Sequence, residues 1–254
     1  MPWDPAQYLV FGDHRLRPAI DLLQRVTLDA PARIVDLGCG PGNVTKVIRQ
    51  RWPAAQILGV DSSPEMLARA RTADPKTEWQ QADLAGWAPD APVDLLYSNA
   101  TLHWLPNHDA LMPKLAGQVA PGGMLAIQMP RNFSEPSHTS IYETVRDGAW
   151  RARLEPLIRV EPTKSADYYW SVLHPHVASL DVWETTYLQA LKGDNPVAEF
   201  VKGSWLGPFL AALEGAERAA FEAAYRARVL RAYPPRPDGS TLFPFRRLFI
   251  VARR

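Results

Sequence analysis

A glycine-rich turn that directly follows a short apolar run constrains this chain more than any other feature. Residues 33–37 (Arg-Ile-Val-Asp-Leu) have the pattern of a short buried strand, and Gly38-Cys39-Gly40-Pro41-Gly42 comes next. Glycine has no Cβ atom, so the backbone can turn sharply and approach a ligand closely. Residues 43–51 then have apolar side chains at helical spacing. A strand, a glycine turn and a helix in this order predict an α/β fold with a ligand at the turn.

The alternation of strands and helices continues along the chain. A helix is expected to begin after Ser63, whose hydroxyl can cap it, with Pro64 in the first turn, and another is expected over 112–119. Further strands are expected at 56–61, 77–81, 93–99 and 124–129. Parallel strands joined by helices predict a sheet that binds its ligand at the carboxyl ends of the strands.

Acidic residues stand at the ends of the first three predicted strands. Asp36 immediately precedes the turn, Asp61 ends the second strand, and Asp83-Leu84 follows the third. A carboxylate at Asp61 can accept hydrogen bonds from a ribose diol, although it could equally cap the next helix. Asp83 could accept from an adenine amine, and Asp36 could face an ammonium group. Because the Gly-x-Gly-x-Gly spacing differs from the dinucleotide pattern, the sequence predicts a nucleoside cofactor without a pyrophosphate.

Composition narrows the class of protein. Hydrophobic residues make up 46% of the 254, enough for a large core, and the formal net charge of +1 disfavours a protein that binds nucleic acid. Cys39 is the one cysteine, which fits a reducing compartment. We find no secretory signal and no apolar run of about 18 residues. We therefore expect a cytoplasmic protein without a membrane partner or a metal site, and a monomer is compatible with the sequence.

Residues 35–42 (Val-Asp-Leu-Gly-Cys-Gly-Pro-Gly) resemble the first motif of the class I S-adenosylmethionine-dependent methyltransferases. Segments along the whole chain resemble the trans-aconitate 2-methyltransferase family more specifically. They include Trp3-Asp4-Pro5, Asp61-Ser62-Ser63-Pro64, Asn99-Ala100 with Trp104-Leu105-Pro106, Gln128-Met129-Pro130 and residues 247–254. The resemblance implies that a carboxylate oxygen of trans-aconitate, a small polycarboxylic acid, attacks the methyl group of S-adenosylmethionine. The products would be a methyl ester and S-adenosylhomocysteine.

The resemblance also implies roles for individual residues. The residues expected to bind the cofactor are Trp3, Tyr8, Phe11, Arg15, Asp36, Gly38, Cys39, Gly40, Asn43, Asp61, Ser62, Met66, Asp83, Leu84, Asn99 and Ala100. The residues expected at the site of methyl transfer are Asn99, His103 and Trp104. On chemical grounds, as cations and hydroxyls that can replace water around a polyanion, the residues expected to bind the substrate are Arg131, Tyr168, Tyr169, Arg246 and Arg247.

The fold that follows is a Rossmann-like class I methyltransferase fold. We expect a seven-stranded, mostly parallel sheet with helices on both faces and a helical lid insertion, all in one domain over residues 1–254. Its expected parts are an N-terminal helical cover (1–30), a cofactor-binding core (31–130), helical substrate or lid elements (131–178 and 194–237) and two closing strands (179–191 and 242–252).

The expected chemistry needs no general base, because a carboxylate with a reference pKa of about 4 is ionised at neutral pH. The enzyme must instead align oxygen, methyl carbon and sulfur and remove water from the nucleophile. Arginine suits the acceptor because its planar guanidinium matches a carboxylate. The segment between Asn132 and Tyr168 matches the family loosely, so a phenol, an amine or another acid stays open as the acceptor. A non-catalytic S-adenosylmethionine-binding protein and a nicotinamide-dependent oxidoreductase are the further alternatives.

Overall fold

The computed structural model describes residues 12–159 and 161–254, and the side chains of residues 12–15 lie outside this description. Two compact units divide the described chain. Unit 1 comprises residues 12–14, 131–159, 161 and 186–246, and unit 2 comprises residues 15–130, 162–185 and 247–254. Each unit thus joins segments that are distant in the sequence. The expected organisation as one methyltransferase domain stays a prediction.

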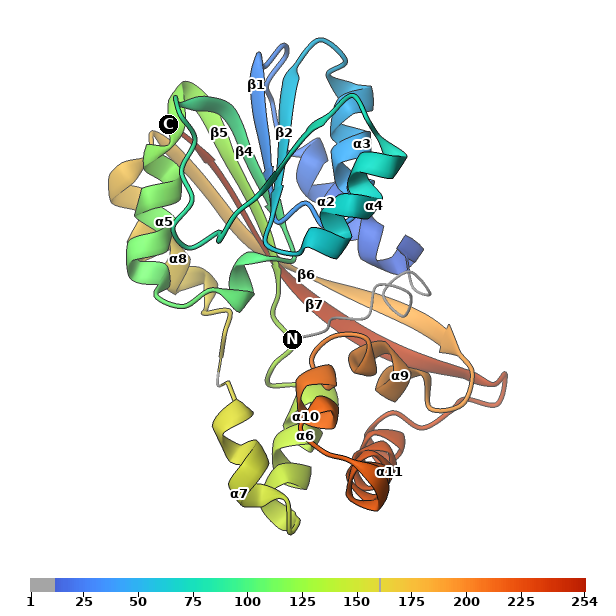
Figure 1. The fold of residues 1–254 in the computed structure, drawn as a ribbon. Helices are drawn as coiled ribbons and strands as arrows, with labels where there is room; N and C mark the ends of the chain where they lie inside the picture. Colours follow the sequence, from blue (N-terminus) through green and yellow to red (C-terminus); the bar gives the residue numbers. More distant parts are fainter. Residues whose placement is uncertain (1–11, 160) are drawn as a thin grey trace. The chain divides into compact units, whose positions relative to one another are not determined.

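The strands form a seven-stranded sheet in the order β3-β2-β1-β4-β5-β7-β6 (Figure 1). They are β1 (Arg33–Leu37), β2 (Gln56–Asp61), β3 (Glu78–Gln81), β4 (Val93–Asn99), β5 (Val119–Pro130), β6 (Ser179–Lys192) and β7 (Ser240–Arg253). The pairs from β3 through β5 are parallel, whereas β7 pairs antiparallel with β5. This arrangement confirms the predicted seven-stranded Rossmann-like sheet.

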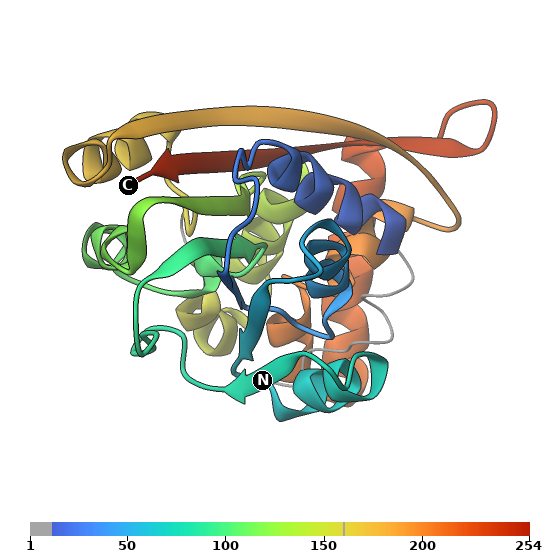
Figure 2. The same cartoon turned by 90° about the horizontal axis from the view of Figure 1, so that it is seen from above.

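Helices of unit 2 cover both faces of the sheet (Figures 1 and 2). On one face lie α2 (Gly12–Gln24), α3 (Asn43–Arg51) and α4 (Pro64–Ala73), and on the other lie α5 (His108–Gly117) and α8 (Ala166–Leu173). Leu37, Leu115 and Leu173 are fully buried in the core beneath α5 and α8. On the opposite face, the Tyr97 hydroxyl donates to the Ala19 carbonyl of α2 at 2.8 Å. Where β1 and β4 pair, the sheet is therefore covered by helices on both faces.

Local sequence signals explain most of the boundaries in unit 2. α3 and β2 have the predicted bounds, and the Ser63 hydroxyl accepts from the Met66 N–H at 3.3 Å at the start of α4. The helix predicted over 112–119 is instead α5 at 108–117. It begins after Asn107, whose left-handed φ of 58° turns the chain. It ends early because Val119 pairs with Val93 in the sheet.

α8 belongs to unit 2. From the sequence we expected it to be part of the helical substrate or lid elements over 131–178. Tyr169 and Leu173 are fully buried in the core of this unit. The Tyr169 hydroxyl also lies 2.7 Å from Nδ1 of His108 on α5. Two short 3₁₀ turns, η1 (Leu102–Trp104) and η3 (His174–His176), complete the description of this unit. Apolar packing and a polar contact together hold α8 against α5.

Unit 1 is built around an aromatic core. Its helical elements are α6 (Pro136–Asp147), α7 (Arg151–Leu154), η2 (Glu155–Leu157), α9 (Pro196–Lys202), α10 (Gly207–Ala211) and α11 (Gly215–Ala232). Phe209, Phe221, Tyr225 and Phe243 rank among its most deeply buried side chains. The helical stretch predicted over 194–237 therefore divides into three helices, and glycines, which weaken helices, stand at the breaks.

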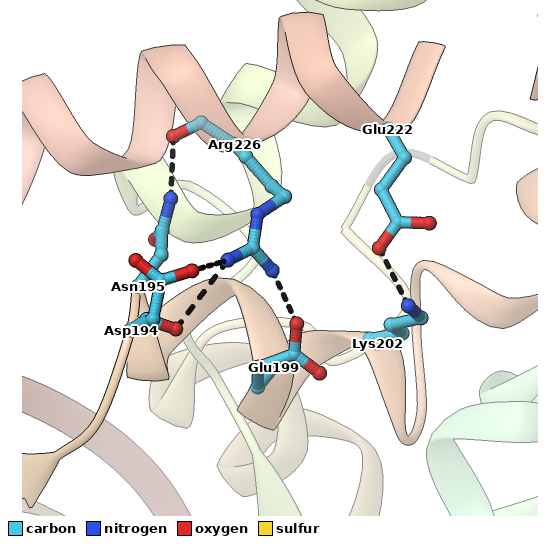
Figure 3. A network of polar contacts seen from close by, with 6 residues as sticks. All are labelled: Asp194, Asn195, Glu199, Lys202, Glu222 and Arg226. Atoms are coloured by element: carbon cyan, nitrogen blue, oxygen red, sulfur yellow. Dashed lines mark hydrogen bonds and ion pairs between the residues drawn. The ribbon is translucent and has the colours of Figure 1, made fainter. Parts of the chain in front are cut away.

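Ion pairs join α9 and the turn before it to α11 in unit 1 (Figure 3). Arg226 of α11 lies 2.5 Å from Asp194 and also pairs with Glu199. Lys202 of α9 lies 2.5 Å from Glu222 of α11. Because one guanidinium contacts two carboxylates, the entropy cost of ordering the Arg226 side chain is shared between two ion pairs.

Candidate active site

The glycine turn after β1 forms a backbone cradle. Gly38, Gly40 and Gly42 have φ angles of +80°, +55° and +82°, which L side chains rarely adopt. A Cβ atom at Gly38 would lie 2.1 Å from the side chain of Thr101, so only glycine fits there. A Cβ atom at Gly40 would meet no atom of the described residues within 4 Å. The described part of the chain thus leaves room for a ligand beside Gly40.

Asp61, at the end of β2, is tied to this turn. Its Oδ2 accepts from the Gly40 N–H at 2.8 Å, and its Oδ1 accepts from the Ser63 N–H at 2.8 Å. The side-chain cap of α4 is Ser63. Each oxygen of Asp61 can accept a second hydrogen bond, and the residue is partly exposed. Asp61 is therefore held in place with capacity for two further donors, as a ribose diol would provide.

Asp36 lies beneath the turn, and its carboxyl group has a raised pKa. Its side chain is buried, and Thr45 Oγ1 donates to its Oδ2 at 2.6 Å. Burial raises the pKa of Asp36 from 3.8 to about 7; the Thr45 hydrogen bond opposes this shift, and the Asp61 carboxylate adds to it. A cation bound nearby would favour the ionised form. The position suits an ammonium group of a ligand.

Other residues expected to bind the cofactor lie at the same edge of the sheet. Ser62 is exposed directly after β2, and Asn43 is exposed at the first position of α3. Asp83 is exposed after β3, and its Oδ1 accepts a backbone N–H at 3.1 Å. Leu84 and Met66 are buried, so their side chains serve the core. Leu84 can still offer its backbone N–H to a ligand.

Cys39, within the turn, is a buried thiol. Burial raises its pKa well above the ordinary range, and the carboxylates of Asp36 and Asp61 add to this shift. A protonated thiol is a poor nucleophile. Cys39 therefore contributes its small size to the turn.

The end of β4 carries the residues expected at the site of methyl transfer. Ala100 has a left-handed φ of 53°, uncommon outside glycine, and its N–H donates to the Gln128 carbonyl at 2.8 Å. Asn99 Oδ1 is buried and accepts no hydrogen bond from the described residues. His103 is buried, and its ring centre lies 4.8 Å from that of Trp104, which is 37% exposed. This strand end therefore combines an unused acceptor with an accessible aromatic ring.

These features fit a nucleoside cofactor with a charged amino-acid tail. The space beside Gly40, the capacity of Asp61 and the unused Asn99 Oδ1 all lie at carboxyl ends of neighbouring parallel strands, where such sheets bind ligands. Burying a polar atom without a partner costs about 1–3 kcal/mol of folding free energy. A polar ligand group beside Asn99 would recover part of that free energy.

Part of the predicted cofactor site lies outside the described residues. Trp3, Tyr8 and Phe11 belong to residues 1–11, which the structure does not describe. Arg15 lies in α2, but its side chain is also outside the description. The roles of these residues stay predictions.

Two arginines expected to bind the substrate lie in unit 1. The Arg131 N–H donates to the Arg246 carbonyl at 2.9 Å, so the two backbones are adjacent. The Arg246 guanidinium forms an ion pair with Glu135 at 3.0 Å, and both side chains are partly exposed. A guanidinium has five donors, so Arg246 can contact a second carboxylate while it stays paired with Glu135.

The remaining substrate candidates lie in unit 2. Arg247 is buried on β7, where it pairs with Pro130. Tyr168 is partly exposed, and burial together with the Asp109 carboxylate raises its pKa to about 12. Tyr169 is fully buried, with its hydroxyl engaged by His108 as described above and by the Lys164 N–H at 3.2 Å. Tyr169 thus supports the core of this unit, a role that the sequence did not reveal.

A buried polar cluster in unit 1 had no predicted role. Nδ1 of His138 lies 3.0 Å from Ser137 Oγ and 3.4 Å from Asn132 Nδ2. Burial lowers the pKa of His138 to about 3, so the ring is neutral. Phe133 packs edge-on against this ring. The signal in the sequence is a run of short polar residues around His138, which alone does not indicate burial.

Two negative findings concern only the part of the chain that the structure describes. No helix there is both long and apolar enough to cross a membrane. Nor do three or more His, Cys, Asp or Glu side chains gather there in a way that could hold a metal ion.

Comparison with known proteins decides the family. A family model described as a methyltransferase domain matches residues 11–175. A trans-aconitate 2-methyltransferase from Azoarcus sp. (strain BH72) is 52% identical over 252 residues, covering 99% of this chain and 99% of that protein. Another from Methylobacterium nodulans is 49% identical over 254 residues, covering 99% and 98%. The chain belongs to the trans-aconitate 2-methyltransferase family.

Solved structures support the fold of this family member. The YcgJ protein of Bacillus subtilis aligns with a TM-score of 0.61 at 14% identity, over 94% of this chain and 99% of that one. A Haemonchus contortus phosphoethanolamine N-methyltransferase 2, solved in complex with S-adenosyl-L-methionine, aligns with a TM-score of 0.56 at 16% identity, over 93% and 52%. At such low identity these likenesses concern the fold alone.

Membership in the trans-aconitate 2-methyltransferase family confirms the resemblance drawn from the sequence. It also confirms the assignment to the S-adenosylmethionine-dependent methyltransferases. The role of each site residue stays a prediction that the geometry above makes specific.

Proposed function

We propose that this chain transfers the methyl group of S-adenosylmethionine to a carboxylate oxygen of trans-aconitate. The products are a methyl ester and S-adenosylhomocysteine. The observation that carries the proposal is the 52% identity to the Azoarcus trans-aconitate 2-methyltransferase over 99% of both chains. The similarity therefore extends over the sequence of both units, and not only over the cofactor turn.

Residues of unit 2 are proposed to hold the cofactor. S-adenosylmethionine, when bound, supplies a methyl group attached to a positively charged sulfur. Asp61, positioned by its bonds to the Gly40 and Ser63 N–H groups, would accept from the ribose. Asp83 and the Leu84 N–H would hold the adenine. Asp36 would face the ammonium group of the methionine part, whose charge would favour the ionised carboxylate.

The acceptor is proposed to react as a carboxylate that is already ionised. No proton has to be removed, so neither His103 nor any other side chain is required as a base. The protein has to orient the acceptor and exclude water from it. Arg131, Arg246 and Arg247 are the proposed ligands of its carboxylates, because arginine binds carboxylates through paired N–H donors.

Transfer of labelled methyl groups tests this proposal. The purified chain is incubated with methyl-labelled S-adenosylmethionine and, separately, with trans-aconitate, other tricarboxylates, phenols and amines. We expect label in an ester of trans-aconitate that alkaline hydrolysis releases. Label in phenols or amines alone would contradict the acceptor assignment and leave the fold unaffected.

A further inference from the structure

Gln128 on β5 is a buried polar residue whose side chain has no hydrogen-bond partner among the described residues. Both polar atoms of its side chain, Oε1 and Nε2, are buried and form no hydrogen bond with the described residues. Folded proteins rarely keep a buried amide in this state, because both atoms lose their bonds to water. A ligand that forms hydrogen bonds with this side chain would explain why the amide is buried without a partner.

The position of Gln128 connects it to the site of methyl transfer. Gln128 and Asn99 are Cα partners in the parallel pairing of β5 with β4, which lie side by side (Figure 1). Side chains of paired residues project to the same face, on strands about 4.8 Å apart. Asn99 Oδ1 is likewise buried without a partner among the described residues. Two neighbouring amides thus have unused hydrogen-bonding capacity at one end of the sheet.

The charge on this face favours an anion. Phe249 of β7 pairs with Gln128, and alternation along β7 places Arg247 on the same face as Phe249. The Arg247 side chain is buried there and carries a permanent positive charge. Asp36 of β1 shares the face; its Oδ2 accepts from Thr45 at 2.6 Å, and in the proposed function its carboxylate is paired with the ammonium group of the cofactor. The unused Gln128 Nε2 donor, on the same face as this guanidinium, is suited to a carboxylate.

We propose that Gln128, through its Nε2 donor, binds a carboxylate group of a ligand beside Asn99 at the site of methyl transfer. The inference rests on the proposed function, in which carboxylates come from two sources. One source is the methionine part of the cofactor, and the other is the acid acceptor. Gln128 acts as a binding residue and takes no part in bond making.

Gln128→Met tests the proposal, because methionine has a similar length and lacks the amide. Removal of an unpartnered buried amide should raise the melting temperature of the free protein by about 2–4 °C. The same change should weaken binding of a carboxylate ligand by roughly 10- to 100-fold, since bonds to charged groups are the stronger ones. Gln128→Glu keeps the shape and adds a negative charge, so it should weaken binding at least as much. A purely structural glutamine would give a lower melting temperature and unchanged binding.

Gln118→Met is the matched control. The side-chain oxygen of Gln118 likewise accepts no hydrogen bond from the described residues, but Gln118 lies just before β5, at the opposite end of that strand from Gln128. Its Nε2 donates to the Trp87 carbonyl at 3.3 Å, so the control variant should lose stability and keep full ligand affinity.

Calorimetry identifies the source of the carboxylate without turnover. S-adenosylhomocysteine is titrated into each variant, and trans-aconitate is then titrated into the protein saturated with S-adenosylhomocysteine. A loss of affinity for S-adenosylhomocysteine assigns Gln128 to the methionine carboxylate. A loss confined to trans-aconitate assigns it to the acceptor. If neither affinity changes, the proposal is overturned. If wild type neither methylates nor binds trans-aconitate, the proposed function fails, and the first titration alone decides the role of Gln128.

Discussion

Replacing Asp36 by asparagine would keep the shape of the side chain and remove its titration. The carboxyl group is buried, and Thr45 donates to it at 2.6 Å. An amide oxygen can still accept this hydrogen bond. The Asp36→Asn variant therefore isolates the free energy of placing a charge beneath the glycine turn.

The direction of the pKa shift fixes the sign of the effect. The proton is bound more tightly in the folded chain, where the pKa is about 7, than in the unfolded chain, where it is 3.8. Stability from this group is fully present below pH 3.8 and is lost as the pH rises through 7. One pKa unit corresponds to about 1.4 kcal/mol, so the complete loss is about 4 kcal/mol. About 3 kcal/mol of it should develop between pH 5 and pH 8.

Urea unfolding, followed by tryptophan fluorescence and circular dichroism, measures this loss. The free energy of unfolding of wild type minus that of Asp36→Asn should fall by about 3 kcal/mol from pH 5 to pH 8 and then level off. The variant should also bind S-adenosylhomocysteine more weakly. Asp74→Asn is the control, because the Thr77 hydrogen bond lowers the pKa of Asp74, and its difference should be flat over this range. A wild-type minus Asp36→Asn difference that is independent of pH would refute the reasoning.

Other substitutions test the glycine cradle and unit 1. Asp61→Ala should weaken S-adenosylhomocysteine binding in calorimetry by at least about tenfold, and unchanged affinity would mean that the ribose assignment is wrong. Gly38→Ala should lower the free energy of unfolding by about 1–3 kcal/mol, and Thr101→Ala in the same chain should make the combined loss less than additive, because Thr101 is the residue that the new Cβ would meet. Arg226→Met should lower stability by about 1 kcal/mol in dilute buffer and by less in concentrated salt, and a loss that ignores salt would exclude the ion pairs as its cause. His138→Gln should reduce the acid lability of unit 1. Because the His138 pKa is about 3 in the folded chain and 6.5 in the unfolded chain, the contribution of this residue to folding stability is lost as the pH falls below 6.5. A variant with the wild-type pH profile of stability would contradict this.

The cofactor half of the fold could be predicted from the sequence because its signals are local. A buried strand, a left-handed glycine turn and a helix with a hydroxyl cap each depend on a few consecutive residues, as at Gly38 and Ser63. The bonds from Asp61 to the turn could not be predicted, because they join residues far apart in the sequence. The position of Asp61 at the end of a predicted strand is nevertheless sufficient to identify it as a candidate cofactor-binding residue.

Features that depend on which strands meet could not be predicted. α5 ends where it does because Val119 pairs with Val93, so strand pairing and not a local helix signal sets this boundary. The sequence predicts Tyr169 as a substrate ligand because it offers a hydroxyl, whereas in the structure this hydroxyl lies 2.7 Å from Nδ1 of His108, which comes from another helix. Gln128 stands within an apolar strand, and only the pairing with Asn99 reveals a shared polar end.

The two neighbours of β5 in the sheet become available at very different times during synthesis. β4 precedes β5 closely, whereas β7 pairs Arg253 with Met124 across the whole second half of the chain. Until β7 arrives, β5 is an edge strand with apolar residues such as Ile127 beside unpaired backbone groups, a template for aggregation. Such long-range pairing is also slow to form. During synthesis, the edge of β5 therefore stays unpaired and prone to aggregation until the second half of the chain has emerged from the ribosome. We expect that the supply of chaperones influences the yield of folded protein.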